Sequence, residues 1–306
     1  DFQSLATGET TTVSFDVTIA DNNGGSDTET VNITVTGTND APAVAAALTG
    51  GAAEDAASFT IDMLAGASDV DTGETATLGV QNVTGLTAGV TVSGNTITVD
   101  PADVAFQYLG VGDGEVITVN YEVVDAQGAT VAQSASITIN GTNDAPVATV
   151  DTATTAENAV LTIDVLANDT DVDLTNTHTV DAVSITLGNG TVAIVNNQVQ
   201  WSPGTAYDYL AVGETATVAL AYDMSDNDGG TASSTATVIV TGTNDAPVAT
   251  VDTATTAENA ALTIDVLAND TDVDLSNTHT VDAVSITSGN GTVAIVNNQV
   301  QWSPGT

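Results

Sequence analysis

The hexapeptide Gly37-Thr38-Asn39-Asp40-Ala41-Pro42 decides the fold, because it recurs unchanged at residues 141–146 and 242–247. Each copy follows a run in which apolar and polar residues alternate, which is typical of a β-strand. Proline fixes φ and lacks a backbone N–H, so the strand is expected to end there. The copies start 104 and 101 residues apart, and roughly 100 residues is the size of a small β-sandwich. We therefore interpret the hexapeptide as the hinge of a tandem array.

Alternation with a period of two continues between the hinges. Val13, Phe15, Val17 and Ile19 share one face of a predicted strand at residues 12–20, and similar runs recur in each repeat. Turns rich in Asn, Asp and Gly separate these runs, and no stretch has a helical period of useful length. Short strands between such turns predict an all-β protein, built from β-sandwich repeats in an elongated array.

The hinges divide the chain into four predicted pieces. These are the C-terminal half of a repeat at 1–40, complete β-sandwich repeats at 41–144 and 145–245, and the N-terminal half of a repeat at 246–306. In a permuted frame the chain is three whole periods, 1–104, 105–205 and 206–306. Two explanations stay open. Either the chain is a window of a longer array, or the half-repeats of identical chains complete each other.

The charge of the chain excludes several classes of partner. The 306 residues include 40 acidic side chains and no Lys or Arg, which gives a net charge of −40. Nothing in the chain can neutralise phosphate, so nucleic acid and anionic membrane surfaces are not expected partners. No apolar run approaches the length that membrane insertion needs. Disorder is disfavoured because 42% of the residues are hydrophobic and they alternate. We expect bound cations to relieve the self-repulsion of the folded state.

Three kinds of acidic cluster recur in the sequence. The first is the Asn-Asp pair of each hinge. The second begins with a Glu about a dozen residues past the hinge and continues as an Asp-x-Asp run; the third is an Asp-rich turn late in the repeat. We expect the turn of one repeat to lie near the linker to the next, where the clusters converge. The predicted metal ligands are Asn39, Asp40, Glu54, Asp69, Asp71, Asn143, Asp144, Glu157, Asp169, Asp171, Asp173, Asp226, Asp228, Asn244, Asp245, Glu258, Asp270, Asp272 and Asp274.

The residue types of these clusters favour Ca²⁺. Carboxylate and carbonyl oxygens suit Ca²⁺, which takes six to eight of them, whereas Mg²⁺ demands a tighter octahedron. Zinc is not expected, because the chain has no Cys and only two His. His178 and His279 occupy equivalent positions and are expected to be solvated. The Asp169-x-Asp171-x-Asp173 run is not an EF-hand, since the sixth and twelfth positions lack the required Gly and Glu.

Three stretches carry a resemblance to a known family: Val-Thr-Gly-Thr-Asn-Asp-Ala-Pro-Val at 240–248, LTIDVLANDTDVD at 161–173 and SDNDGGTAS at 225–233. They resemble the VCBS-type and cadherin-like tandem repeats of large bacterial surface adhesins. The similarity is looser at 41–140, where Asp125-Ala126-Gln127-Gly128 stands in place of the acidic turn. The resemblance implies immunoglobulin-like sandwiches in series, calcium at their junctions and secretion to the cell surface. By similarity to the cadherin linker, the hinge Asn-Asp, the Glu of the following repeat and its Asp-x-Asp would be ligands.

The predicted function is that of a stalk or extender in an extracellular adhesin or filament, stiffened by Ca²⁺. Its expected partners are neighbouring repeats of the same or identical chains. The alternative is a calcium-dependent module that binds a glycan or a partner protein in adhesion or biofilm. Residues 72–90 diverge most between the repeats, yet they contain no aromatic residue for such a site. No enzyme is expected, because Cys is absent and His occurs at two equivalent positions.

Overall fold

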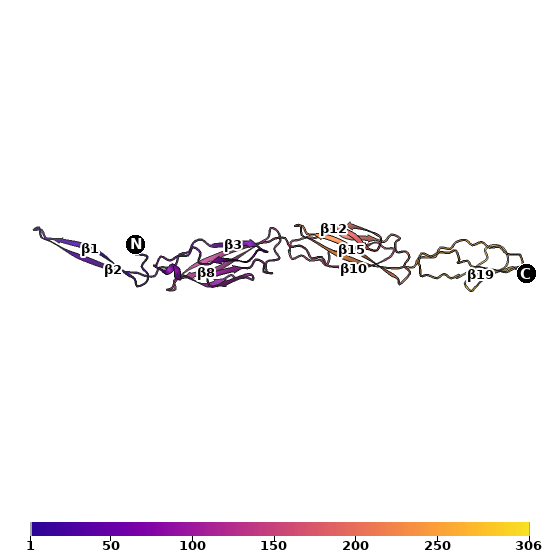
Figure 1. Cartoon of the computed structure of the whole chain (residues 1–306), viewed down its shortest axis with the longest axis horizontal. Coiled ribbons are helices and arrows are strands. Elements are labelled where there is room, and N and C mark those ends of the chain that lie inside the picture. The colour runs from indigo at the N-terminus through magenta and orange to yellow at the C-terminus, as the bar shows by residue number, and fades with distance from the viewer. Residues whose placement is uncertain (1, 306) are drawn as a thin grey trace. The chain divides into compact units, whose positions relative to one another are not determined.

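The computed structural model describes residues 2–305, which form two compact units (Figure 1). The first unit extends to Asp144 and includes Val172–Asn176; the second comprises Ala145–Asp171 and the chain from Thr177. The described residues form strands β1–β19 and one 3-10 helix. None of their helices is long and apolar enough to cross a membrane. The all-β prediction is therefore confirmed.

The first unit begins with an isolated hairpin. Strands β1 (Thr10–Ala20) and β2 (Ser26–Thr36) pair antiparallel along their whole length. The carboxylate of Asp21 holds the turn by accepting the N–H groups of Asn23 and Gly25, both at 2.8 Å. The apolar face of the hairpin is not covered, since Phe15 is 47% exposed.

A β-sandwich follows in the same unit. Its four-stranded sheet has the order β3–β9–β8–β5, and its three-stranded sheet has the order β4–β7–β6. The bounds are β3 Leu48–Ala53, β4 Phe59–Asp62, β5 Gly79–Thr84, β6 Val90–Ser93, β7 Thr96–Val99, β8 Gly114–Val124 and β9 Thr130–Asn140, with the 3-10 helix at Glu74–Thr77. Strand β3 pairs parallel to β9, and the other neighbours are antiparallel.

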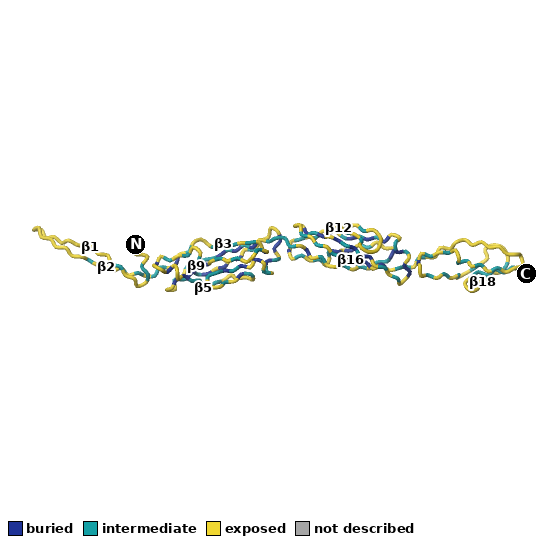
Figure 2. The backbone as a smooth tube through the Cα atoms, in the orientation of Figure 1, coloured by how far each residue is buried: buried dark blue, intermediate teal, exposed yellow. Residues whose placement is uncertain are grey.

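The core of this sandwich lies between the two sheets. Ile97 and Val99 of β7 pack in one cluster with Val119 of β8 and Ile137 of β9, all of them fully buried. Figure 2 shows buried segments along the strands of this sandwich, mixed with more exposed ones. The alternation in the sequence thus predicts which residues face inward.

The second unit contains a sandwich with the same topology. The sheet order is β10–β16–β15–β12 on one side and β11–β14–β13 on the other. The bounds are β10 Asp151–Ala156, β11 Leu161–Ile163, β12 Thr179–Leu187, β13 Thr191–Val195, β14 Gln198–Ser202, β15 Thr215–Ser225 and β16 Thr231–Thr241. Trp201, Leu220, Tyr222 and Val238 form the centre of its core.

The last strands of the second unit make a smaller sheet. Strands β17 (Leu262–Ile264), β18 (Thr292–Val296) and β19 (Gln299–Ser303) pair in the order β17–β19–β18, which matches β11–β14–β13. Between residues 246 and 305, the structure shows no counterpart of β10 or β12. Those two strands pair with β16 and β15, and no equivalents of β15 and β16 follow in the described chain.

The glycine of the recurring hexapeptide has a steric role in each copy. A Cβ at Gly141 would lie 2.2 Å from the carbonyl oxygens of Leu109 and Gly110. Gly37 and Gly242 meet carbonyl oxygens just as closely, at 2.1 and 2.3 Å. The N–H of Gly141 also donates to the Asp113 carbonyl at 3.0 Å. Only glycine allows the chain to leave the last strand this close to the preceding loop.

Candidate metal centre

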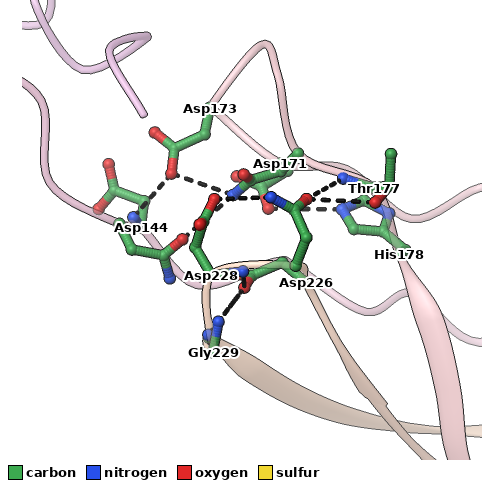
Figure 3. Close-up of polar contacts among 12 residues, drawn as sticks. Asp144, Asp171, Asp173, Thr177, His178, Asp226, Asp228 and Gly229 are labelled. Atoms are coloured by element: carbon green, nitrogen blue, oxygen red, sulfur yellow. Dashed lines mark hydrogen bonds and ion pairs between the residues drawn. The ribbon is translucent and has the colours of Figure 1, made fainter. Parts of the chain in front are cut away.

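The first acidic cluster combines Glu54, Asp144 and Asp173, whose carboxylates each offer one oxygen within 4.8 Å of the others. Glu54 directly follows β3, and its N–H donates to the Asn140 carbonyl at 3.0 Å. The Asp144 N–H donates to Asp173 Oδ2 at 2.9 Å, as Figure 3 shows. The Leu174 N–H donates to the Tyr108 carbonyl at 3.4 Å and fixes the neighbouring loop.

Burial of these carboxylates destabilises the folded state unless a cation is bound. Glu54 is 0% exposed and Asp173 is 2% exposed. Glu54 Oε1 accepts the Thr142 N–H at 2.7 Å, whereas Oε2 has no hydrogen-bond partner among the described residues. Burial raises the pKa of the Glu54 carboxyl, and the charges of Asp144 and Asp173 raise it further. A buried carboxylate with an unsatisfied oxygen fits a bound cation, because an unpaired buried charge is strongly unfavourable.

A second acidic cluster lies around the first hinge. Asp69, Asp71 and Glu74 each offer an oxygen within 4.8 Å of the others. The Asp40 N–H donates to Asp71 Oδ2 at 2.9 Å. The Asn39 amide donates to Asp125 Oδ2, also at 2.9 Å. Hinge, Asp-x-Asp run and late turn therefore meet at one end of the repeat.

The second unit repeats the hydrogen bonds around Glu54, although among the described residues Glu157, Asp245 and Asp274 do not form a compact acidic group. Glu157 is 0% exposed, and its Oε1 accepts the Thr243 N–H at 2.8 Å. The Asp245 N–H donates to Asp274 Oδ2 at 3.0 Å. Burial, together with the charges of Asp274 and Glu157, raises the pKa of Asp245. Glu258, by contrast, is exposed.

The late turn of the second unit is held by its own aspartate. Asp226 is 6% exposed. Its Oδ1 accepts the N–H groups of Asp228, Gly229 and Gly230 at 2.8, 2.6 and 2.9 Å, as Figure 3 shows in part. This is ordinary turn chemistry for aspartate. It accounts for one oxygen of Asp226.

Two further predicted ligands, Asp169 and Asp270, accept hydrogen bonds from elsewhere in the fold. Asp169 Oδ1 accepts the Thr149 N–H at 2.7 Å, and its carboxylate also accepts the Tyr222 hydroxyl. Asp270 Oδ1 accepts the Thr250 N–H in the same way. Neither residue belongs to a compact acidic group of the described chain. The sequence offered no sign of this, because the tyrosine lies 53 residues further along.

We expected His178 and His279 to be solvated, but each imidazole lies beside an aspartate. His178 Nε2 lies 3.4 Å from Asp171 Oδ2, and His279 Nε2 lies 3.3 Å from Asp272 Oδ2. The His178 side chain is only 16% exposed. Each imidazole therefore contacts the first aspartate of an Asp-x-Asp pair.

The grouping of the clusters also differs from the expected one. We expected Glu54 to join the Asp69-x-Asp71 run of its own repeat, and the late turn to lie near the linker to the next repeat. Instead, Glu54 contacts the hinge that follows its repeat, whereas Asp71 and Asp125 contact the hinge that precedes it. The reason is the parallel pairing of β3 with β9, since both strands end at the same edge of the sheet.

Glu74 was not among the metal ligands predicted from the sequence, and the structure adds it to the second acidic cluster. It lies in the divergent stretch 72–90 and opens the 3-10 helix. The signal that could have found it is its position three residues after Asp71, where the other repeats have Asn176 and Asn277.

Comparison with protein families places known domains along most of the chain. The model for a bacterial cadherin-like domain matches residues 143–242, and that for a cadherin-like domain matches residues 38–140. The model for a bacterial Ig domain matches residues 244–306. No curated protein matches the chain.

Solved structures with a similar fold include extracellular domains of protocadherins. The protocadherin gamma B4 extracellular domain aligns with a TM-score of 0.52 and 19% identity, over 99% of this chain and 52% of that one. The protocadherin gamma B7 EC3-6 cis-dimer structure aligns with a TM-score of 0.54 and 15% identity, over 100% of this chain and 76% of that one. This chain thus spans about half the length of the first. At such identity the likeness shows the fold, which is that of tandem β-sandwich domains.

Proposed function

We propose that this chain, which belongs to the bacterial cadherin-like and immunoglobulin-like tandem-repeat proteins, is an extender of an extracellular adhesin or filament. Ca²⁺ bound at the acidic ends of its repeats makes the array stiff. In this proposal the repeats act as spacers that provide length, and other parts of the protein bind the target.

The observation that carries this proposal is the cluster of Glu54, Asp144 and Asp173. Its three oxygens lie within 4.8 Å of one another, and two oxygens bound to one Ca²⁺ at about 2.4 Å can be no further apart than this. All of its ligand atoms are hard oxygens, which favours Ca²⁺ over a transition metal.

The origin of the three ligands explains how binding would stiffen the chain. Glu54 follows strand β3, Asp144 lies in the hinge, and Asp173 comes from the loop after β11. By sequence, Glu54 and Asp173 belong to successive predicted repeats. One cation held by all three therefore restrains the linker between them. Its charge also offsets the repulsion of carboxylates that the protein itself cannot neutralise, as it has no Lys or Arg.

Thermal unfolding in Ca²⁺, and then in EGTA with Mg²⁺, tests the proposal. We expect Ca²⁺ to raise the unfolding temperature and Mg²⁺ to fail to replace it. Glu54→Gln should lose part of this calcium-dependent stabilisation, because it removes a charge from the cluster and keeps its shape. Glu29→Gln in the exposed strand β2 is the matched control. Equal unfolding temperatures in Ca²⁺ and EGTA would overturn the proposal.

A further inference from the structure

Two positions at the first hinge have exchanged an acid and an amide relative to the following repeat. The Glu74 N–H donates to the Asp71 carbonyl at 3.1 Å, and the Asn176 N–H donates to the Asp173 carbonyl at 3.2 Å. These residues thus occupy the same place in equivalent turns. Glutamate stands in one repeat where the next has asparagine.

The compensating change is in the late turn. The Gln127 N–H donates to Asp125 Oδ1 at 2.9 Å, as the Asp228 N–H donates to Asp226 Oδ1 at 2.8 Å. Gln127 therefore stands where the next repeat has Asp228. Each repeat has one carboxylate at this pair of positions. It is at Glu74 in the first repeat and at Asp228 in the next.

The two exchanged side chains contact each other in the first repeat. The Gln127 amide donates to Glu74 Oε1 at 2.6 Å. This hydrogen bond orients the glutamate and satisfies only one of its oxygens. Glu74 is 6% exposed, and within residues 2–305 its Oε2 has no hydrogen-bond partner. A buried carboxylate oxygen without a donor indicates a ligand at this position.

Two neighbours of Glu74 also have buried carboxylate oxygens without a hydrogen-bond partner among the described residues. Asp71 is 2% exposed, and its Oδ1 has no hydrogen-bond partner in the described part of the chain. Asp69 Oδ2 is also buried and without a partner there. Together with Glu74 they present three carboxylates within 4.8 Å. Burial raises the pKa of Glu74, and the charges of Asp71, Asp69 and Asp125 raise it further, which reflects the cost of keeping these charges together.

We propose that Glu74 is a Ca²⁺ ligand of the repeat at 41–144, at a position where the following repeat has Asn176. Asp69 and Asp71 bind the same ion, and Gln127 positions Glu74 through Oε1. This inference rests on the proposed calcium function. It gives the repeat at 41–144 a set of Ca²⁺ ligands that differs from that of the following repeat.

Calcium titration calorimetry of the whole chain, with a swap of the exchanged pair, tests the inference. Glu74→Gln should weaken binding at one site by about tenfold, because affinity depends on the number of charged ligands. The double variant Glu74→Asn with Gln127→Asp recreates the pattern of the following repeat and should restore the affinity. The single variant Glu74→Asn should stay weak.

Two controls separate a ligand from a structural residue. In EDTA, Glu74→Gln should unfold at no lower temperature than the wild type, because it removes repulsion. If it unfolds at a lower temperature there, Glu74 acts on folding alone and the inference is wrong. If Glu74→Gln and the wild type bind Ca²⁺ equally while Glu54→Gln binds more weakly, this inference fails and the proposed function stands. If Glu54→Gln also binds as the wild type does, the proposed function fails.

Discussion

Residues 248–305 nearly repeat the sequence of residues 147–204, yet the two stretches have different surroundings. Trp201 is 0% exposed in the core of its sandwich, whereas the equivalent Trp302 is only half-buried. Residues 179–187 form strand β12, but the equivalent residues 280–288 form no strand. The cause of the difference is the presence of the second half of the repeat, because only residues 147–204 are continued by β15 and β16 in the described chain.

The contacts that both stretches share are made between residues close in sequence. The indole N–H of Trp201 donates to the Asn189 carbonyl at 3.1 Å, and that of Trp302 donates to Asn290 at 3.3 Å. The hairpin of β13 and β14 recurs as β18 and β19. Local pairing thus forms the small sheet in both places. The strands β10 and β12 and the buried core require the other half of the repeat.

The largest expected difference between the two stretches is in amide hydrogen exchange. Strand β12 pairs with β15 at the edge of its sheet. Those of its amides that bond to β15 should exchange only when the sandwich opens, with protection that approaches the free energy of global unfolding, about 5 kcal/mol or more. The amides of residues 280–288 lack that pairing and should exchange orders of magnitude faster. Mass spectrometry of the two peptides measures this directly. Equal protection would contradict the comparison.

The two tryptophans should differ nearly as much on truncation. Trp201→Ala removes the largest side chain of a closed core and should cost about 3–5 kcal/mol of unfolding free energy. Trp302→Ala should cost no more than about 1 kcal/mol, since that side chain is only half-buried. Calorimetric unfolding of both variants checks this. A similar loss for both would show that residues 246–305 close a core of their own.

The two equivalent glutamates should differ in their response to calcium. Glu157 is 0% exposed and contacts the following hinge through Thr243, whereas Glu258 is exposed. Glu157→Gln should lose much of the stabilisation by Ca²⁺, which is about 3 kcal/mol at a hundredfold excess over Kd. Glu258→Gln should behave as the wild type in the same calcium titration of the unfolding temperature. The reverse order would contradict the placement of the calcium ligands.

The smallest expected difference concerns Asp151 and its exposed counterpart Asp252. Burial raises the pKa of Asp151, and the charges of Asp169 and Asp164 raise it further. A raised carboxyl pKa stabilises the fold below the ordinary value of 3.8, and that stability is lost as pH rises through the folded pKa.

Asp151→Asn should therefore stabilise the protein at pH 7 by about 0.5 kcal/mol and flatten the dependence of stability on pH. The control Asp252→Asn should change neither quantity. Denaturant unfolding from about pH 3 to about pH 8 decides the matter, because this range spans the ordinary Asp pKa of about 3.9. A loss of stability at pH 7 in Asp151→Asn would show that its carboxylate is needed for hydrogen bonding instead.

The sequence predicted what depends on short-range pattern. The strand predicted from alternation at residues 12–20 is confirmed as β1. The hinge pairs Asn39-Asp40 and Asn143-Asp144 do lie beside aspartates. These features follow from residues near in sequence and from the two-residue period.

The pairing of distant clusters could not be predicted in the same way. Glu54 reaches the hinge at Thr142 only because β3 runs parallel to β9, and that pairing joins residues almost 90 positions apart. Tyr222 likewise draws Asp169 into its own hydrogen bonds. Both contacts depend on strand order, which alternation alone does not encode. The domain boundaries and the full ligand list stay predictions.

Small-angle X-ray scattering during a calcium titration tests the central claim most directly. If Ca²⁺ at Glu54, Asp144 and Asp173 restrains the linker, the maximum dimension should be largest and best defined in saturating Ca²⁺. It should fall in EGTA, Mg²⁺ should not restore it, and Glu54→Gln should need more Ca²⁺ to reach it. Identical scattering curves in Ca²⁺ and in EGTA would contradict the account, because the acidic clusters would then be turn residues without a role in stiffness.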